Sequence, residues 1–418
     1  MGLRAPHPFR MPGVLGLILV MFCATAMAGP SRGVAHGICT ALRPLADGSK
    51  DAAPALQHCL DSASPGSTVQ IPAGSYLLLS PIIVRRPLAL TTAGLPSGAP
   101  ACRRVDPRCA TLLPTMSATA SAQAPMPIDF QADNLAIDHI IFAGSRTRAP
   151  KLAATLCLST TARGLAGGLR LNGQNVHVTR SVFRDFACYS AFEMGAGSGV
   201  ITDNLFANNG THNVNMMWSD GLTIHDGKHL RVSNNLFVDN TDVQLIFGGC
   251  TDCSVTGNRF RHSIGEAGGS FAELMIHAWP AGATSGRYDG TVVSNNDIDC
   301  GPRHRCGFGI MIGARPWYQA PTSGGTLTGN HVRNAMLGIN VDGLSGPVQI
   351  GSNQVVSAPG SYRASCGAKS VTAGINIAPS SRGFVSNAQV AQSASAESYA
   401  DCLLNYPSFS RTTATAAH

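Results

Sequence analysis

The chain has 418 residues, of which 13% are charged, 6% are aromatic and 46 are glycine. This composition is typical of an exported β-protein rich in turns and argues against an α-helical protein. The formal charge of +7 is compatible with an acidic polymer as partner. Because no run of lysine and arginine is interleaved with aromatic residues, we expect no nucleic-acid partner.

Residues 1–28 have the pattern of a secretory signal peptide. A segment with two arginines precedes an apolar run over residues 14–23, and small residues end at Ala28. The run is too short to span a bilayer, and no later apolar run is longer. We therefore expect a secreted or periplasmic protein that has no membrane partner after cleavage of the signal.

Residues 29–125 are expected to form an N-terminal cap and the first repeating units. A short helix is predicted from about Asp51, and residues 67–78, STVQIPAGSYLL, predict a strand. A helix at this position is suited to cover the first edge of a repeating fold, because exposed strand edges pair with other chains. Residues 95–127, rich in Pro, Ala and Ser, predict a long loop.

Residues 126–392 contain a repeat. Segments such as HLRVSNNLFVDN and CSVTGNRFRHS share a β-branched run, a small polar turn, an asparagine and a following apolar residue. In the first repeat, Arg180-Ser181 takes the place of the asparagine. The aligned asparagines are Asn204, Asn235, Asn258, Asn296, Asn330 and Asn353. Their spacings of 31, 23, 38, 34 and 23 residues indicate coils of fixed minimum length with inserted loops, which is typical of a parallel β-solenoid. Stacked asparagines would hydrogen-bond to one another along the axis.

Each coil carries a second strand, as in GLTIHD, ELMIHA and GIMIGA. Strict alternation along these strands assigns one set of side chains to the interior and the other to the surface. The predicted inward residues are Leu222, Ile224, Leu274, Ile276, Ile310, Ile312, Ile339, Val341, Ile375 and Ile377. The predicted outward residues are Thr223, His225, Leu245, Phe247, Met275, His277, Met311, Asn340, Asp342 and Asn376.

The cysteines predict disulfides. Thirteen cysteines less the one at position 23 leave an even number after the signal, as in a disulfide-bonded exported chain. Three close pairs are local candidates, namely Cys102 with Cys109, Cys250 with Cys253 and Cys300 with Cys306. No further Cys or His pair follows at zinc-finger spacing, so we expect no metal site. Residues 393–418 have little pattern and are expected to form a C-terminal tail, with the last residues disordered.

The strand STVQIPAGSYLL after a short helix, followed by asparagine-rich coils, resembles the right-handed parallel β-helix of the pectin-lyase-like superfamily. The resemblance covers roughly residues 45–390. Within it, WSDGLTIHD resembles the Asn-Thr-Asp-Gly strand of polygalacturonase-like (family 28) glycoside hydrolases, and NTDVQLIFGG resembles their Gly-Asp-Asp strand. Phe308 replaces a histidine of that family, and the Arg-Ile-Lys element has no counterpart here. The expected fold is all-β, a right-handed parallel β-helix with an N-terminal capping helix.

Asp220 and Asp242 are the candidate acid/base pair. They lie 22 residues apart, about one coil, and adjacent strands stack about 4.8 Å apart. Two carboxylates this close raise the pKa of one of them, which supplies a protonated acid beside an ionised base. Glycoside cleavage needs such a pair. The structural alternative is that Asp before Gly caps a turn.

His225 and His277 are further candidate catalytic residues. In a second hypothesis, one of them abstracts a proton from a uronate, as in a polysaccharide lyase or C5-epimerase, with Ca²⁺ or an arginine neutralising the carboxylate. Ca²⁺ is expected only in that case, and otherwise no cofactor. The candidate substrate-binding residues are Glu193, Trp218, Asp226, Gln244, Glu273, Trp279, Arg315, Trp317 and Asp342.

The sequence thus predicts an exported, monomeric, carbohydrate-active enzyme that hydrolyses a polysaccharide in a groove on the β-helix. The lyase or epimerase is the first alternative. A β-helix protein that only binds glycans is the second.

Overall fold

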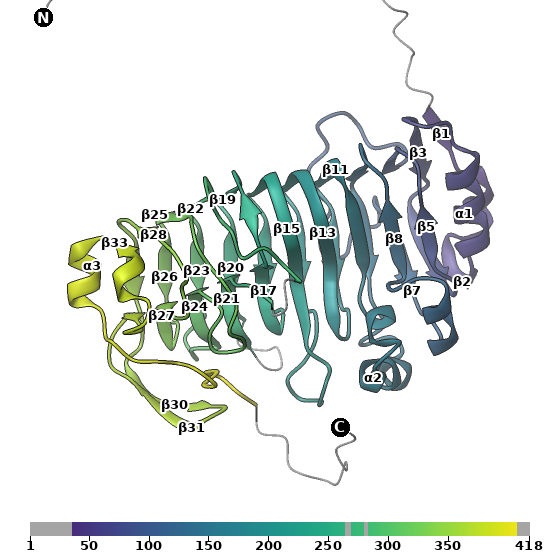
Figure 1. Ribbon diagram of the computed structural model, residues 1–418. Coiled ribbons are helices and arrows are strands. Elements are labelled where there is room, and N and C mark those ends of the chain that lie inside the picture. The colour runs from purple at the N-terminus through teal and green to yellow at the C-terminus, as the bar shows by residue number, and fades with distance from the viewer. Residues whose placement is uncertain (1–35, 264–268, 280–282, 408–418) are drawn as a thin grey trace, which may run out of the picture. The chain divides into compact units, whose positions relative to one another are not determined.

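The computed structural model describes residues 36–263, 269–279 and 283–407, and its parallel strands wind into stacked coils (Figure 1). Each coil contributes one strand to each of three ladders, so the predicted parallel β-helix is confirmed. The predicted signal peptide, residues 1–28, lies outside the described residues. None of the described helices is both long and apolar enough to cross a membrane.

The first ladder begins each coil. Its strands are β1 (His36–Ile38), β3 (Thr68–Ile71), β6 (Ala89–Thr92), β9 (Ala136–Asp138), the ends of β11 (Leu169–Thr179), β13 (Tyr189–Thr202) and β15 (Ser219–Ser233), then β18 (Cys250–Thr251), β19 (Ser254–Thr256), β22 (Val292–Ser294), β25 (Thr326–Thr328), β28 (Val348–Ile350) and β33 (Val385–Ser386). The long strands β11, β13 and β15 continue from the third ladder into the first, which joins the two ladders into one sheet.

The second ladder follows after a tight turn. Its strands are β2 (Asp47–Asp51), β4 (Gly74–Leu78), β7 (Ala110–Pro114), β10 (Ile140–Ala143), β12 (Val182–Arg184), β14 (Leu205–Ala207), β16 (Leu236–Val238), β20 (Arg259–Arg261), β23 (Asp297–Asp299), β26 (His331–Arg333) and β29 (Gln354–Val356). β7 lies inside the segment predicted as a long loop.

The third ladder carries the candidate site. Its strands are β5 (Ile82–Val84), β8 (Ile128–Gln131), the beginnings of β11, β13 and β15, then β17 (Asp242–Phe247), β21 (Ser270–Ile276), β24 (Cys306–Ile312), β27 (Leu337–Val341) and β32 (Ile375–Ile377). An antiparallel hairpin, β30 (Gly360–Ala364) and β31 (Gly367–Val371), extends from the last coils.

The predicted asparagine ladder is confirmed at the turn between the first two ladders. Each Nδ2 donates to the Oδ1 of the next asparagine at 2.9–3.0 Å, from Asn204 through to Asn353. At the start of the row, the Ser181 N–H donates to Asn204 Oδ1, as the alignment predicts. The turn residue before every asparagine of the row except Asn353, for example Asp203 or Asn234, has a positive φ that Asp, Asn and Gly tolerate best.

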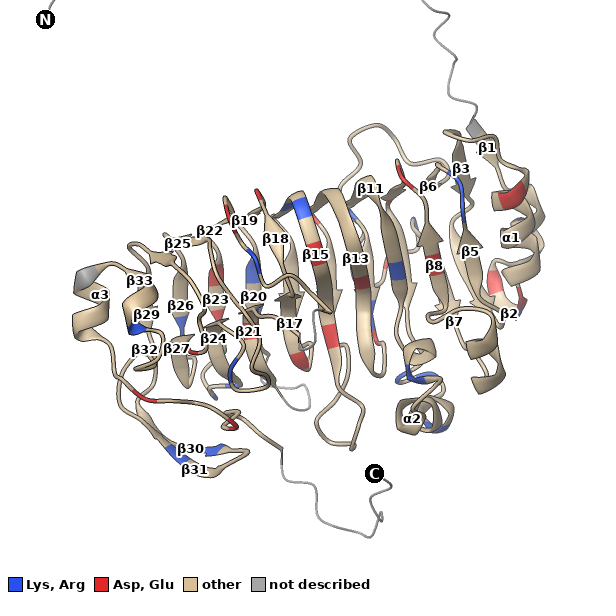
Figure 2. Cartoon of the chain, viewed as in Figure 1, with Lys and Arg blue, Asp and Glu red and all other residues tan. Residues whose placement is uncertain are grey.

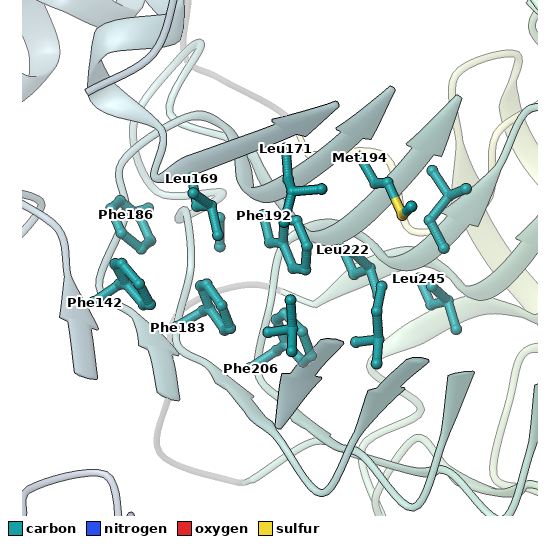
Figure 3. Close-up of a cluster of buried hydrophobic side chains, with 14 of the residues drawn as sticks. Phe142, Leu169, Leu171, Phe183, Phe186, Phe192, Met194, Phe206, Leu222 and Leu245 are labelled. Carbon is teal, nitrogen blue, oxygen red and sulfur yellow. The ribbon is translucent and has the colours of Figure 1, made fainter. Parts of the chain in front are cut away.

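The core lies between the three ladders. The rings of Phe142, Phe183, Phe206, Phe237 and Phe260 stack along the axis with centroid separations of 4.7–5.0 Å (Figure 3). Aliphatic side chains from the third ladder face this stack, and all the residues predicted to point inward on β15, β21, β24 and β27 are buried there. Stacked rings of this kind combine a large buried apolar area with favourable ring contacts.

Two residues predicted to point outward on β17 are instead in the core. Leu245 pairs with Leu222, and Phe247 pairs with Ile224, and all four belong to the interior. The in-register spacing is therefore 23 residues, whereas Asp220 and Asp242 are 22 apart. Asp220 and Asp242 are thus one residue out of register, and a bulge with Phe271 of β21 as its extra residue lies between the pairs Asp242–Ser270 and Val243–Ala272.

Helices close the N-terminal end and flank the coils. α1 (Ala53–Ser62) confirms the predicted capping helix and buries Leu56 and Leu60 against the first coils. The remaining helices are α2 (Pro150–Leu158), α3 (Ala388–Ser393) and the 3₁₀ helices η1 (Thr40–Leu45), η2 (Ala118–Ala122), η3 (Arg163–Ala166) and η4 (Arg382–Phe384).

All twelve cysteines in the described residues form disulfides. The three predicted local pairs are confirmed. The others are Cys39–Cys59, Cys157–Cys188 and Cys366–Cys402. The last one ties the β30–β31 hairpin to residues 394–407, called the strap below, which run from α3 back along the third ladder (Figure 1). Residues 411–418, predicted to be disordered, lie outside the described residues.

Candidate functional site

Charged residues lie side by side on the neighbouring strands β8, β11, β13 and β15 of the third ladder (Figure 2). Asp129, Arg170, Glu193 and Thr223 occupy successive positions in register across these strands. Such a row runs along the axis of the β-helix, with one side chain per strand and a strand spacing of about 4.8 Å. Burial raises the pKa of the Asp129 carboxyl, against the opposing influence of Gln131 and Arg170.

Asp220 and Asp242 lie on adjacent strands beside this row. The Val243 N–H donates to Asp220 Oδ1 at 3.1 Å, so the Asp220 carboxylate is one peptide away from Asp242. The Thr223 hydroxyl donates to Asp220 Oδ2 at 2.9 Å and lies 2.7 Å from Ser190 Oγ. The structure therefore brings together the two carboxylates that the sequence pairs.

Both carboxyl groups favour the protonated form more than an ordinary aspartate does. Each residue keeps some solvent exposure, yet the surrounding protein desolvates the carboxyl group. This desolvation and the neighbouring charge of Asp242 raise the pKa of Asp220 well above its usual value. Desolvation also raises the pKa of Asp242, to about 6, with Arg163 acting in the opposite direction. The pair thus keeps a proton at a pH where isolated aspartates have lost theirs.

Arg163 is the cation that influences the pKa values of both carboxyl groups. It was not among the residues predicted from the sequence. It begins η3, in the excursion between β10 and β11, and its Nη1 donates to the Cys157 carbonyl at 2.8 Å. Cys157 is bonded to Cys188, the residue just before Tyr189. The disulfide therefore anchors α2 and η3 beside β13, and burial lowers the pKa of the Arg163 guanidinium. No repeat marks this excursion, so the sequence carries no signal for its position.

Glu193 is the centre of a second polar cluster. Its Oε1 lies 3.4 Å from Arg170 Nε, and its Oε2 lies 3.7 Å from His225 Nε2. Burial alone would raise the pKa of Glu193, but the neighbouring His225, Tyr189 and Arg170 hold it below its usual value. Glu193 is therefore an ionised anchor. Tyr189 is 37% exposed, and burial and Glu193 raise the pKa of its phenol.

His225 also contacts Trp279, which lies at the edge of this cluster. The two rings are stacked, with centroids 5.1 Å apart and planes inclined by 14°. Asp226, the next residue, accepts hydrogen bonds from the Ser285 N–H at 3.1–3.2 Å and from its hydroxyl. Asp226 therefore holds Ser285 in place, which is a structural role.

Gln244 and Glu273 were expected at the surface, but the structure places both inside the coil. Neither has any exposed surface. Gln244 Oε1 accepts from Asn240 Nδ2 at 2.8 Å, and its Nε2 donates to Glu273. Glu273 also lies 2.8 Å from His262 Nε2, and His262 Nδ1 lies 3.4 Å from Asp239. These residues form a buried network at the turn into the third ladder, where none of them is exposed at the surface.

His277, Trp317, Asp342 and Arg315 lie farther along the β-helix than Asp220. His277 is buried among aromatic rings, and burial lowers its pKa to about 4. Asp342 is buried and accepts from the Tyr399 N–H of the strap at 2.7 Å, while burial raises its pKa. Arg315 is the cation that faces Asp342. Asp342 therefore helps to hold the strap.

Trp218 lies between the region of Asp220 and the region of Trp317. Its ring is edge-to-face with Phe271 and Tyr406, at centroid distances of 5.6 and 6.3 Å. Together with His225 and Trp279, it forms the aromatic border of the site. Of the predicted residues, the structure thus gathers Asp220, Asp242, Glu193, His225, Trp218 and Trp279 in one region.

Three members of the site other than Arg163 were also missed, namely Asp129, Arg170 and Tyr189. The segments IDFQ, LRLN and FEMG each place one charged residue between two apolar ones, which is the signature of an outward position on a half-buried strand. Aligning these three segments would have predicted the row of Asp129, Arg170 and Glu193.

Comparison with solved structures supports the fold. The polygalacturonase of Erwinia carotovora ssp. carotovora is similar with a TM-score of 0.52 and 12% identity, over 74% of this chain and 91% of that one. The endo-xylogalacturonan hydrolase of Aspergillus tubingensis gives 0.52 and 13%, over 77% and 93%. The Dettilon tailspike protein gives 0.50 and 13%, over 86% and 68%. No protein-family model and no curated protein sequence matches the chain. At these identities the likeness establishes the parallel β-helix fold, and fold alone does not define an activity.

Proposed function

We propose that the protein is a carbohydrate-active enzyme that hydrolyses glycosidic bonds of a polysaccharide, with Asp220 as general acid and Asp242 as base. The observation that carries the proposal is the pair itself, two carboxyl groups on adjacent strands that are desolvated together beside one arginine. Two of the similar structures are named as hydrolases of pectic polymers, which supports a sugar polymer as substrate.

The chemistry needs one protonated and one ionised carboxyl group. The Asp220 carboxylic acid donates its proton to the glycosidic oxygen as the bond from that oxygen to the anomeric carbon breaks. The Asp242 carboxylate accepts a proton from the water that supplies the new hydroxyl. We assign the acid role to Asp220 because desolvation and the charge of Asp242 both raise its pKa, so that this group keeps its proton while Asp242 is ionised. Arg163 limits the repulsion between the two carboxyl groups.

The neighbouring cluster supplies binding groups for a sugar chain. Trp279 presents an aromatic ring at the border of the site, and exposed parts of Arg170 and Tyr189 provide hydrogen-bond donors. The six disulfides support a location outside the cytoplasm, secreted or periplasmic.

A polysaccharide lyase is the second candidate, and one observation favours it. Tyr189, His225 and Arg170 surround Glu193 on the outer face, so a base, a phenol and a cation lie together. In β-elimination on a uronate, the base removes the C5 proton, the C4–O bond breaks, and the leaving oxygen takes a proton. Arginine or Ca²⁺ would neutralise the uronate carboxylate. The third possibility, a protein that only binds glycans, predicts binding without turnover.

The deciding experiment incubates the purified protein with polygalacturonate, xylogalacturonan, alginate and a neutral galactan. Reducing ends and the ultraviolet absorbance of unsaturated uronates are followed together. We expect reducing ends without absorbance, and a loss of about 10²–10⁴-fold in rate for Asp220→Asn and Asp242→Asn. The matched control is Asp289→Asn, because Asp289 lies in an exposed ion pair with Arg287 away from the site.

The outcomes separate the candidates. Absorbance that rises with the reducing ends, and that survives Asp220→Asn but not His225→Ala, would assign the lyase. Binding of a polymer by the wild type and by both Asp variants, without turnover on any polymer, would assign the glycan-binding protein.

A further inference from the structure

The outer face of the third ladder changes character between β15 and β17. Three rows of outward positions cross this boundary. In the first, Ser190 and Asp220 are followed by Val243, which is 2% exposed. In the second, Glu193 and Thr223 are followed by Ile246, which is 6% exposed. Two of the rows thus turn from polar to apolar and buried at the same strand.

The third row is closed by an aromatic ring. In this row His225 is followed by Gly248, the residue directly after β17. A Cβ added to Gly248 would lie 2.3 Å from the Trp279 ring. Trp279 therefore covers this position directly. By contrast, the His225 side chain is 36% exposed and that of Arg170 34%, so the strands before the boundary are open to solvent.

The strap covers the outer face beyond the boundary. The outward residues of β21, β24 and β27 are buried in one apolar cluster with Tyr399, Leu403 and Leu404 of the strap. Asn405 Nδ2 donates to the carbonyls of Ser270 and Arg305 at 3.1 and 3.0 Å, and the Tyr399 ring contacts Phe308. The strap is thus anchored across several coils.

Where the strap ends, its last aromatic ring completes a wall beside the acid pair. Asp242 pairs with Ser270, and the next residue, Phe271, is 1% exposed. Phe271 is packed by Trp218, Trp317 and Tyr406, with ring centroids 5.6–6.0 Å away. This set of Trp218, Phe271, Trp317 and Tyr406 is called the aromatic wall.

We infer that the protein acts on the end of a polysaccharide chain rather than on internal bonds. The inference rests on the proposed function. A chain lying along the open row of Asp129, Arg170 and Glu193 reaches Asp220 and Asp242 and then meets the aromatic wall. Only a short terminal part of the polymer fits between the acid pair and the wall, so cleavage releases a small product of fixed size.

The experiment uses the wild-type protein and the polymer of the four above that yields most reducing ends. Products are separated by size from the first time points, and viscosity is recorded in parallel. A single small product from the start, with viscosity falling slowly relative to reducing ends, is expected. A mixture of long oligomers with rapid loss of viscosity would overturn the inference while leaving the proposed function intact. Absence of turnover on all four polymers would overturn both.

A pair of tyrosine variants tests the wall itself. Tyr406→Ala removes the ring that closes the wall, and the smallest product is expected to lengthen by at least one sugar. The matched control is Tyr362→Ala, because Tyr362 packs on the same apolar cluster but contacts His304 on the hairpin side. An unchanged product size in Tyr406→Ala, with its melting temperature equal to that of the control, would overturn the role of the wall.

Discussion

Asp242 has a backbone φ of +78°, in the left-handed region that non-glycine side chains rarely adopt. Such a conformation costs of the order of 1–3 kcal/mol and persists only where the surroundings impose it. Asparagine tolerates the same backbone region, so Asp242→Asn removes the charge and leaves the backbone in place.

The acid pair predicts a bell-shaped dependence of kcat/KM on pH. The pKa of Asp242 is raised to about 6, so the fraction of ionised base increases as the pH rises through that value. The pKa of Asp220 is raised well above its usual value, so activity falls at higher pH, where this acid loses its proton. Since the two groups titrate as a pair, the two limbs report the pair rather than one residue. A profile with its optimum near pH 4 would contradict this assignment.

His262 predicts a second dependence on pH, in stability. Burial of the ring opposes its charge, but Glu273 and Asp239 outweigh burial and raise the pKa of His262 to about 9. Because this value lies above that of the unfolded chain, about 6.5, the stabilisation is complete below about pH 6.5. It is lost as the pH rises through about 9.

We therefore expect the melting temperature of the wild type to fall between pH 7 and pH 9.5. His262→Gln leaves two buried carboxylates without their cation and should cost roughly 3–5 kcal/mol at pH 7, with a flatter pH dependence. His331→Gln, at an exposed position of β26, is the control. Parallel slopes for wild type and His262→Gln would refute the charged state of His262.

At the residue scale, the sequence could identify Asp220, Asp242, Glu193 and His225 because they lie in segments whose repeat is visible. Arg163 could not be found in this way, since a disulfide between distant cysteines determines where it lies. Glu273 was misplaced for another reason. Strict alternation with Leu274 inside assigns its side chain to the surface, whereas a buried hydrogen-bond network with His262 holds it inside.

At the scale of the element, the asparagine ladder fixes the coils in register. The Asn258 side chain donates to Asn296 Oδ1 and to the Val232 carbonyl, and it accepts from the N–H and Nδ2 of Asn235. All of these groups are buried, so the side chain satisfies backbone groups that water cannot reach.

Asn258→Ala should therefore lower the stability by about 1–3 kcal/mol through unsatisfied buried polar groups. Asn353→Ala should cost less, because Asn353 ends the row and is partly exposed. The measurement is the denaturation midpoint of each variant against wild type. Equal losses for the two variants would show that the middle of the ladder has no special role.

The sequence predicted this ladder but not a second one at the turn into the third ladder. There Asn209 Nδ2 donates to Asn240 Oδ1 at 2.7 Å, and Asn240 Nδ2 donates to Gln244 at 2.8 Å. The signal was present, because Asn209 and Asn240 follow Asn204 and Asn235 by five residues each. The bulge in β21 at Phe271 was harder to predict, since one inserted residue leaves the hydrophobic pattern almost unchanged.

At the scale of the described β-helix, the disulfide between Cys366 and Cys402 joins the strap to the hairpin. It closes a separation of 36 residues, for which loop-closure entropy predicts a stabilisation of about 3–4 kcal/mol. We expect Cys366→Ser/Cys402→Ser to speed hydrogen exchange in residues 394–407 more than in the coils. Cys102→Ser/Cys109→Ser, which opens a separation of 7 residues, is the control. Unchanged exchange in the strap would show that packing alone holds it.

The fold of the coils was predictable because each coil repeats one pattern. The strap was not, since its contacts with β21, β24 and β27 depend on packing between segments that share no pattern. The residues of the strap were expected to form a tail, and nothing in their sequence indicates which face they cover.

The asparagine ladder also has a bearing on how such a protein can change over generations. Each asparagine hydrogen-bonds to the asparagine of the next coil, which keeps the two coils in register. Loops of different lengths can therefore be inserted between these turns without changing the register of the neighbouring coils. The excursion that carries Arg163 and the strap that closes the site are therefore separate segments, both attached to coils whose register the asparagine ladder fixes. A descendant could exchange either one, and with it the polymer that it recognises, while inheriting the acid pair and the core intact.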